Sequence, residues 1–582
     1  MGEAAVAANE AAETPQRSKE IVVETRIVER HSQMPFITLE KNMSSNVRKR
    51  RTPALAVAAI AALAVISLAA AAPLQAQTYT GVLTWHNDNQ RTGQNLAETI
   101  LTPANVNPKE FGKLFTYAVD GQIYAQPLYV SSVTIPNLGV HNVVYVATEN
   151  DSVYAFDADG LVTTPLWQVS LILNSGSAVP CGATGACSGI GPVIGITGTP
   201  VIDGLSGTLY VVAFTAENGS WVQRLHALDI TTGVEKFNGP TVIEASVPGT
   251  GGGAVGGNVA FEAIHESQRT ALLLSNGIVY MGWGTFAYAP WHGWIMGYDA
   301  QTMKQVAFYN DTANGKRGGI WNSGSGFAAD IEDNIYVLTG DGTFDGNTGG
   351  VDYGDSFLRL TPTGTNGLSV ADYFTPFNQS YLSTNDLDVG SGGGLIVPTQ
   401  GGAHPEEIIG GGKESMIFVC DRTNLGGYSS TTNNNVQTVT APGNGFWSSP
   451  AYWNGFIYYS GSASPLVAYS LTNGLLSTSP VAEGPTTFAF PGTTPSISAN
   501  GSKTGIVWVI QDPSGMPKGG APAVLRAYEA SNVTKQIYGS SQMGTRDAAG
   551  PGVKFAVPTV YNGKVYVGTQ TGLTVYGLLP TK

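Results

Sequence analysis

The densest group of side chains that could do chemistry is a loop rich in carboxylates. Asp341 and Asp345 each precede a glycine in the segment 341–347, and Asp352 and Asp355 follow. Carboxylate oxygens are the ligands that a hard cation such as calcium takes. The spacing is not that of an EF-hand, and the same residues also suit a series of solvated Asp-Gly turns. The loop therefore predicts either a metal site that includes Asp341 and Asp345 or a plain turn series.

The three cysteines of the chain give a second set of reactive groups. Cys181 and Cys187 flank a short glycine-containing loop, and in an oxidising compartment we expect them to form a disulfide. Cys420 lies in an apolar strand pattern and is expected to be a buried residue. The sequence has no Cys-x-x-Cys-His motif and no zinc-ligand spacing, so we expect neither an attached haem nor zinc.

The elements that must position these residues are short strands in a repeating unit. Its clearest copy runs from Val557 to Leu578, where Asn562-Gly563 supplies the positive φ of a tight hairpin turn. Eight copies align on one central strand, with these residues in its middle: Tyr145, Tyr210, Tyr280, Tyr336, Phe418, Tyr458, Trp508 and Tyr566. A mean spacing of about 60 residues fits four short strands, and such units must stack to bury both faces. The sequence therefore predicts an all-β fold, an eight-bladed β-propeller of four-stranded antiparallel blades.

The two ends of the repeat predict how the ring closes. The last copy stops after its third strand, and a lone strand pattern at Lys113 to Val119 precedes the first copy. Pairing the two supplies the missing fourth strand and removes open sheet edges. We expect the propeller at 111–582, closed by this N-terminal latch strand, with residues 77–110 as a lead-in.

The composition agrees with this class of fold and narrows the partners. The chain of 582 residues is 42% hydrophobic and only 12% charged, with 74 glycines and 32 prolines, as in turn-rich β proteins. A formal net charge of −13 argues against nucleic acid as a partner. We expect a small-molecule ligand or a protein partner instead.

Residues 1–76 differ in character from the rest of the chain. Residues 1–42 are polar and mixed in charge, and they read as a disordered extension or a misassigned start ahead of Met43. Four basic residues at 48–51 then precede an apolar run at 54–72, which is typical of a signal peptide at 43–76. Left uncleaved, the run is long enough to anchor the chain in a membrane. We expect an exported protein of the cell envelope, periplasmic or extracellular.

The repeat resembles that of the pyrroloquinoline quinone (PQQ) propellers. Residues 227–237 are similar to the family's blade-docking motif A-x-D-x-x-T-G-K-x-x-W, with Phe237 at the position of the tryptophan. Other copies are more degenerate, and the resemblance covers residues 111–578. This family includes PQQ-dependent alcohol and sugar dehydrogenases as well as non-catalytic scaffolds, so the fold alone does not choose between them.

The resemblance also implies site residues. Residues 413–422 are similar to K-x-G-x-I-F-V-L-D-R, whose lysine hydrogen-bonds the quinone, which implies that Lys413 contacts the cofactor. Asp388 ends a stretch similar to D-x-W-D, whose last aspartate is the family's proposed general base. Asp341 falls where the family has a calcium-binding asparagine, and Trp321 falls near the tryptophan on which the quinone stacks. The implied cofactors are therefore PQQ and calcium.

Two functional classes follow from these residues. Val193 falls where the family has a calcium-binding glutamate, and a valine cannot coordinate a metal. With the degenerate docking motifs and the lack of a haem segment, Val193 favours a ligand- or partner-binding scaffold. Asp388 and Lys413 favour the alternative, a PQQ-dependent oxidoreductase of an alcohol or sugar, in which a carboxylate takes the hydroxyl proton while hydride passes to the quinone.

The signal-peptide hypothesis predicts that the mature chain begins at or near Gln77, because Leu74-Gln75-Ala76 provides the small-residue cleavage pattern. N-terminal sequencing of the exported protein measures this directly. Recovery of residues 1–42 on that protein would contradict the prediction.

Overall fold

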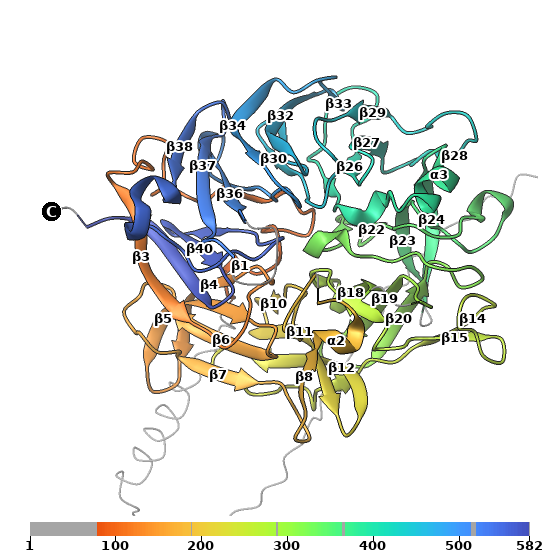
Figure 1. Ribbon diagram of the computed structural model, residues 1–582, viewed down its shortest axis with the longest axis horizontal. Coiled ribbons are helices and arrows are strands. Elements are labelled where there is room, and N and C mark those ends of the chain that lie inside the picture. Colours follow the sequence, from red (N-terminus) through yellow and green to blue (C-terminus); the bar gives the residue numbers. More distant parts are fainter. Residues whose placement is uncertain (1–77, 188, 287–288, 364–366, 514–519, 581–582) are drawn as a thin grey trace, which may run out of the picture. The chain divides into compact units, whose positions relative to one another are not determined.

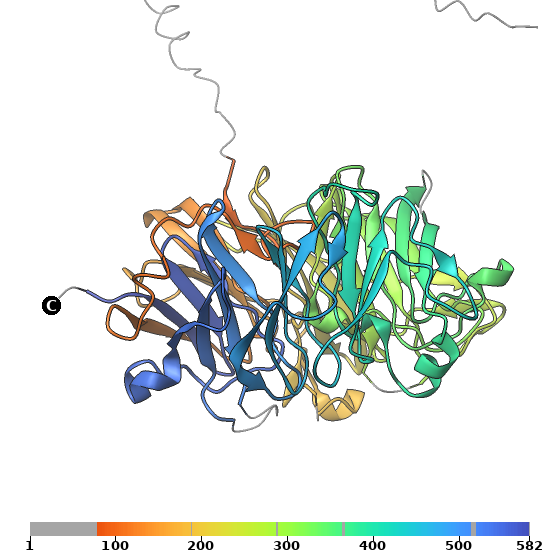
Figure 2. The same ribbon diagram turned by 90° about the horizontal axis from the view of Figure 1, so that it is seen from above.

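The computed structural model describes residues 78–187, 189–286, 289–363, 367–513 and 520–580. The extension expected at 1–42 and the signal peptide expected at 43–76 lie outside these described residues. Eight mainly antiparallel sheets stand in a ring (Figure 1), and a view turned by 90° shows the blades side by side (Figure 2). The structure confirms the predicted all-β, eight-bladed β-propeller.

The first four blades follow one another along the chain. Blade 1 contains β1 (Gly81–Val82), β4 (Leu128–Ile135), β5 (Gly139–Ala147), β6 (Ser152–Asp157) and β7 (Trp167–Ser170). Blade 2 contains β10 (Val201–Asp203), β11 (Thr208–Glu217), β12 (Ser220–Asp229) and β13 (Thr241–Val242), with β8 (Ser177–Pro180) and β9 (Val193–Ile194) added at β11. Blade 3 contains β16 (Glu266–Gln268), β17 (Leu273–Ser275), β18 (Ile278–Thr285), β19 (Trp294–Asp299) and β20 (Gln305–Asn310). Blade 4 contains β21 (Ala328–Ala329), β22 (Ile335–Leu338), β23 (Phe357–Thr363), β24 (Gly367–Thr375) and β28 (Gly427–Tyr428).

The other four blades complete the ring. Blade 5 contains β25 (Leu395–Ile396), β26 (Glu407–Gly411), β27 (Met416–Asp421) and β29 (Gln437–Thr440). Blade 6 contains β30 (Ala451–Trp453), β31 (Phe456–Tyr459), β32 (Ser464–Thr472), β33 (Leu475–Leu476) and β34 (Ala482–Phe488). Blade 7 contains β2 (Gln94–Asn95), β35 (Ser496–Asn500), β36 (Lys503–Gln511), β37 (Val524–Glu529) and β38 (Gln536–Gly539). Blade 8 contains β39 (Thr559–Tyr561), β40 (Lys564–Gly568), β41 (Gly572–Leu578) and β3 (Phe111–Ala118).

The remaining elements are small and lie between the blade strands. They are the hairpin β14 (Ser246–Pro248) and β15 (Asn258–Ala260), the helices α2 (Cys181–Thr184) and α3 (Gln379–Thr384), and the 3-10 turns η1 (Asn322–Gly324), η2 (Gly346–Thr348), η3 (Val389–Ser391) and η4 (Ser540–Arg546). None of the helices in the described residues is long and apolar enough to cross a membrane. The apolar run at 54–72 lies outside these residues.

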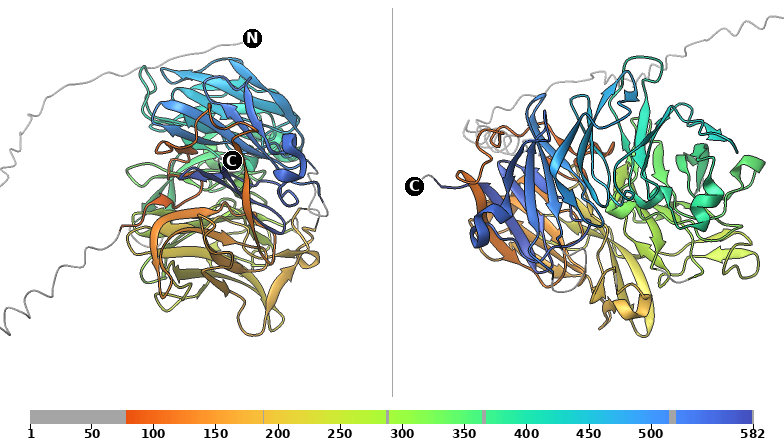
Figure 3. Two further views of the ribbon diagram at one scale, coloured as in Figure 1. Left: turned by 90° about the vertical axis from the view of Figure 1, so that its left-hand side faces the viewer. Right: turned by 45° about the horizontal axis from the view of Figure 1, so that its top comes forward.

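The ring closes as the sequence predicts. Strand β3 pairs antiparallel with β41, with Phe111 opposite Leu578 and Ala118 opposite Gly572. The two strands lie side by side in Figure 1 and Figure 3. The latch therefore joins the start of the propeller to its end, and blade 8 takes its fourth strand from the N-terminal side of the chain.

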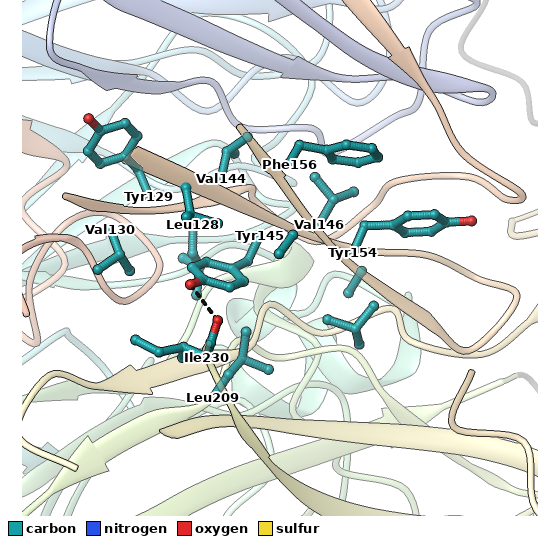
Figure 4. Packing of buried hydrophobic residues seen from close by; sticks show 14 of the residues in the cluster. Leu128, Tyr129, Val130, Val144, Tyr145, Val146, Tyr154, Phe156, Leu209 and Ile230 are labelled. Atoms are coloured by element: carbon teal, nitrogen blue, oxygen red, sulfur yellow. Dashed lines mark hydrogen bonds between the residues drawn. The ribbon is translucent and has the colours of Figure 1, made fainter. Parts of the chain in front are cut away.

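The repeated tyrosines connect neighbouring blades. The hydroxyl of Tyr145 on β5 donates to the carbonyl of Ile230 in blade 2 at 2.9 Å, the bond dashed in Figure 4, among tightly packed aliphatic side chains. The same bond recurs from Tyr210 to Ala300 (2.7 Å), from Tyr458 to Ala530 (2.8 Å) and from Tyr566 to Ala158 (3.1 Å). In each case the acceptor follows the acidic residue that ends the third strand of the next blade. The aromatic repeat thus buries apolar area and satisfies a turn carbonyl between blades.

One residue of the repeat lies on a different strand from the one expected. The sequence aligned Phe418 with the tyrosines of the second blade strand, but Phe418 lies on β27, the third strand of blade 5. The second strand is β26, which ends in Gly410-Gly411. There Ile409 stands opposite Leu395 on the first strand, the place that Tyr458 takes opposite Ala451 in blade 6. The absent aromatic explains the wrong alignment.

Residues 79–97 of the predicted lead-in form a segment that we call the axial strap. It makes a hydrogen bond to the innermost strand of every blade, with partners Ser131, Ile202, Leu274, Ala329, Ile396, Tyr452, Ile497 and Val560 in blades 1 to 8. Most of these bonds join backbone groups, for example Tyr452 N to Thr92 O at 2.8 Å and Ile497 N to Gly93 O at 2.7 Å. The strap therefore fills the axis of the ring.

Arg91 is the central side chain of the axial strap and is fully buried. Its guanidinium donates to the carbonyl of Phe327 at 2.8 Å, to the carbonyl of Trp85 at 2.9 Å and to the hydroxyl of Thr84 at 2.8 Å. Burial lowers the pKa of Arg91, and the charge of Asp88 opposes this in part. The resulting pKa is about 10. Arg91 thus ties the strap to the ring with charge-assisted hydrogen bonds.

We predict that Arg91→Met destabilises the fold by about 3 kcal/mol or more, because several buried acceptors lose a charged donor at once. The denaturant midpoint of the whole chain measures this loss. Lys503→Met, which removes the same charge from the exposed start of β36, should change the free energy of unfolding by about 0.5 kcal/mol or less. Equal effects of the two substitutions would contradict the role of Arg91.

Candidate functional site

A cavity of about 430 Å³ lies where strand ends of blades 3, 4 and 5 meet. Its walls come from segments that follow the second strand of a blade or precede the first strand of the next one. The lining residues are Arg269, Thr285, Trp291, Arg317, Trp321, Ser323, Asp341, Asp386, Asp388, Ser391, Lys413 and Trp447. These segments leave the strands at the same end, so the topology of the ring gathers them on one face.

Three carboxylates form the acidic part of the cavity. One oxygen each of Asp341, Asp386 and Asp388 lies within 4.8 Å of the other two, a spacing that suits a metal ion. Asp341 and Asp388 are buried, whereas Asp386 is exposed. The Asp341 backbone N–H donates to Asp388 Oδ1 at 2.7 Å, which fixes the two residues relative to each other.

The charges around Asp341 are unbalanced. Burial and the neighbouring Asp388 carboxylate raise the pKa of Asp341, and the ion pair from Arg317 Nη1 to Asp341 Oδ2 at 2.7 Å only partly opposes them. Arg317 is itself substantially exposed, so solvent weakens its effect. The cluster thus lacks positive charge at Asp341, which a bound cation would supply.

Lys413 supplies the positive charge at the other end of the cluster. Its Nζ lies 2.5 Å from Asp388 Oδ2 and 2.7 Å from Asp386 Oδ1. Burial pulls the pKa of Lys413 down, but its interactions with Asp388 and Asp386 outweigh burial and hold the pKa above its ordinary value. The backbone N–H of Lys413 also donates to the carbonyl of Asp388 at 3.0 Å, so backbone and side chain hold the pair together.

The indole ring of Trp321 lies against the backbone of three glycines. A Cβ on Gly340, Gly284 or Gly319 would come within 2.0, 2.5 or 2.9 Å of the ring, so no larger residue fits at these positions without moving it. The indole N–H donates to the carbonyl of Thr285 at 3.3 Å. The ring is therefore fixed as a flat aromatic surface in the cavity wall.

The structure brings together most of the residues that the sequence singled out. Asp388, Lys413, Trp321 and Asp341 all line the cavity. Asp345 does not, because its Oδ1 accepts the backbone N–H of Asp352 at 2.8 Å within the loop itself.

Four further residues from the sequence also lie outside the cavity lining. Val193 lies on β9, where it pairs with Pro180. A disulfide joins Cys181 and Cys187, whose Cα atoms are 4.9 Å apart, and the thiol of Cys420 is buried.

Other cavity residues were not singled out from the sequence. Asp386 precedes Asp388 by two positions, so the same motif could have identified it. Arg269, Arg317 and Trp447 have no motif of their own, and Arg269 and Trp447 come from blades that are distant in sequence. They share only a position in the segments between blade strands, which can be recognised only after every strand is assigned.

Comparison with solved structures supports the fold. The chain is similar to the quinohemoprotein alcohol dehydrogenase ADHIIG from Pseudomonas putida HK5, with a TM-score of 0.54 and 12% identity, covering 86% of this chain and 81% of that one. It is less similar to the computationally designed Ika8 protein (TM-score 0.43, 10% identity, 80% and 100% covered) and to Sqt1 of Saccharomyces cerevisiae (0.44, 8%, 81% and 100%). No protein-family model and no curated protein matches the sequence. At this identity the similarity shows a propeller like that of a quinoprotein dehydrogenase.

We predict that Asp341→Asn flattens the dependence of thermal stability on pH. Unfolded aspartates titrate near pH 4, roughly, whereas folded Asp341 keeps its proton to a higher pH. The wild-type protein should therefore lose stability as pH rises above about 4 and through the raised pKa, because ionisation then opposes folding. The variant cannot ionise at this position and should lose less.

Melting temperatures measured without added metal between about pH 4 and pH 9 test this slope. Asp203→Asn, which changes a half-buried carboxylate at the end of β10 in blade 2, should keep the wild-type slope. An equally steep slope for Asp341→Asn would contradict the prediction.

Proposed function

We propose that this propeller is an exported oxidoreductase that binds a PQQ-type quinone and a divalent cation in the cavity and oxidises an alcohol or sugar. The observation that carries the proposal is the convergence of Asp388, Asp341, Lys413 and Trp321 in one cavity. These residues come from separate segments of the chain, and each has a distinct role in that chemistry.

The side chains fit the two cofactors. The flat face of Trp321 suits a planar ring system, and the three glycines packed against the indole keep it from rotating. Asp341, Asp386 and Asp388 offer oxygen ligands to a hard cation such as calcium. The raised pKa of Asp341 supports the same conclusion, because a cation is the group that would restore its ordinary ionisation.

Each residue would contribute one step of the binding and proton transfer. When bound, the quinone would accept hydride and the cation would polarise its oxygens. Asp388 would accept the proton of the substrate hydroxyl, and its bond from the Asp341 N–H orients the carboxylate for this. Lys413 would leave Asp386 to donate to an oxygen of the ligand, since Asp386 is exposed and water can replace the lysine there.

A second candidate is a binding propeller without a redox cycle. The observation that favours it is the ion pair between Lys413 and Asp388, which already neutralises the proposed base. Val193 also lies away from the acidic cluster, so the calcium-binding glutamate of the resembling family has no counterpart there. In this case the cavity would hold a small molecule, or its rim a protein partner of the cell envelope, and no turnover would follow.

We predict that Lys413→Ala weakens PQQ binding about tenfold to hundredfold, because a charge-assisted hydrogen bond contributes roughly 1.5 to 3 kcal/mol. Asp388→Asn should keep the cofactor but lose turnover, since an amide cannot accept the proton at neutral pH. Absorbance titration with PQQ and calcium measures binding, and dye reduction measures turnover.

Lys503→Ala provides the control, because this lysine is exposed and should change neither quantity. Wild-type protein that fails to bind PQQ at high micromolar concentration with calcium present would rule out the oxidoreductase. The binding propeller would then be the better description.

A further inference from the structure

Two cationic side chains from distant parts of the chain meet on one aromatic ring beside the cavity. Arg269, from the start of blade 3, has its Cζ 4.2 Å from the centroid of the Phe555 ring. Lys554, which precedes blade 8, has its Nζ 5.5 Å from the same centroid. Arg269 lines the cavity, and Lys554 lies next to this wall on the shared Phe555 ring.

Aromatic side chains connect Lys554 to the same wall. Its Nζ lies 5.9 Å from the centroid of Phe490, whose ring packs edge-on against Trp447 at 5.1 Å. Trp447 is another lining residue of the cavity. Cations and aromatic faces thus alternate along this side, an arrangement that keeps two positive charges in a partly desolvated place.

The two cations are not neutralised by ion pairs within the part of the chain that the structure describes. Nη2 of Arg269 is buried there without a hydrogen-bond partner. Burial and, next, the charge of Arg269 lower the pKa of Lys554 to about 8, against the opposing effect of Asp512. Burial also lowers the pKa of Arg269, and Tyr124 and the Glu149 carboxyl only partly offset this. A buried donor without a partner and two adjacent like charges are both unfavourable without an anion.

The backbone at Phe555 is a separate indication of a built site. Its φ is 67°, in the left-handed region that bulky side chains rarely adopt. Strained backbone of this kind persists where the surroundings enforce it, and it is concentrated at ligand sites. Here the strained residue is the one whose ring both cations share.

From these observations we infer that Arg269 and Lys554 form a subsite for an anionic group, a carboxylate or a phosphate, of the ligand in this cavity. A guanidinium fork and an ammonium donate together to such a group, as in other anion sites. The ligand class is therefore a molecule that carries at least one such group. The inference rests on the proposed function in one respect, because both require that a ligand binds in this cavity.

The anionic group belongs either to the quinone or to a second ligand such as the substrate, and calorimetry with four probes separates these sources. The probes are inorganic phosphate, citrate, PQQ with calcium, and the uncharged trimethyl ester of PQQ with calcium. Wild-type protein is compared with Arg269→Gln, Lys554→Gln and the control Lys503→Gln, which removes an exposed cation elsewhere.

We expect each site variant to bind citrate or phosphate at least about tenfold more weakly than wild type, and the control to bind them equally. If the quinone supplies the group, PQQ weakens similarly in the variants while its ester does not. If a second ligand supplies it, only citrate or phosphate weakens. Either pattern supports the subsite.

Unchanged binding of PQQ, citrate and phosphate in both variants overturns the subsite and leaves the proposed function intact. Loss of citrate binding in the variants, with no PQQ binding by wild type, supports the subsite and overturns the proposed function. If Arg269→Gln does not fold, Arg269→Lys keeps the charge, and Lys554→Glu must then lose citrate and phosphate binding. Retained binding in Lys554→Glu overturns the inference.

Discussion

The hydrogen bonds between the axial strap and the eight innermost strands are the constraint on which the rest of the structure depends. Each innermost strand has one edge that faces the axis, and its backbone groups need partners when they are buried. The strap supplies a partner in every blade, and Arg91 adds side-chain bonds at the centre. Some of the segments that build the cavity, such as the one with Asp388 and Ser391, end at these same strands, so the strap also fixes part of the frame of the site.

The blade repeat could be predicted from the sequence because one strand pattern serves two purposes. The recurring tyrosine fills the space between blades and donates to a turn carbonyl of the next blade, as Tyr145 does to Ile230. This double role keeps the residue type recognisable over a spacing of tens of residues. Blade 5 lacks the aromatic at this position, where Ile409 stands opposite Leu395 of the first strand. The alignment therefore moved to Phe418, one strand further along, although the number of blades was still correct.

The candidate site could be predicted only in part, for a similar reason. Asp341, Asp388, Lys413 and Trp321 belong to local stretches that resemble known motifs, so the sequence alone could single them out. Arg269 and Lys554 lie far apart along the chain. They meet on Phe555 only because the ring of eight blades closes. The hydrogen bonds of the axial strap could not be predicted from the sequence either, because most of them use backbone groups that any residue has. Asp345 is a case in which the sequence predicts a metal ligand, but its carboxylate accepts a backbone hydrogen bond inside its own loop.

The axial strap also restricts the number of blades that the ring can have. Repeat architectures generally tolerate the gain or loss of a unit, since each unit contacts only its neighbours. In this chain, the order of partners along the strap matches the order of eight innermost strands, from Ser131 in blade 1 to Val560 in blade 8. A ring with one blade fewer would leave a strap group unpaired, and a ring with one more would leave an inner strand without its partner. Duplication or deletion of a blade in this lineage would therefore require a matching change in a segment that lies outside the repeat.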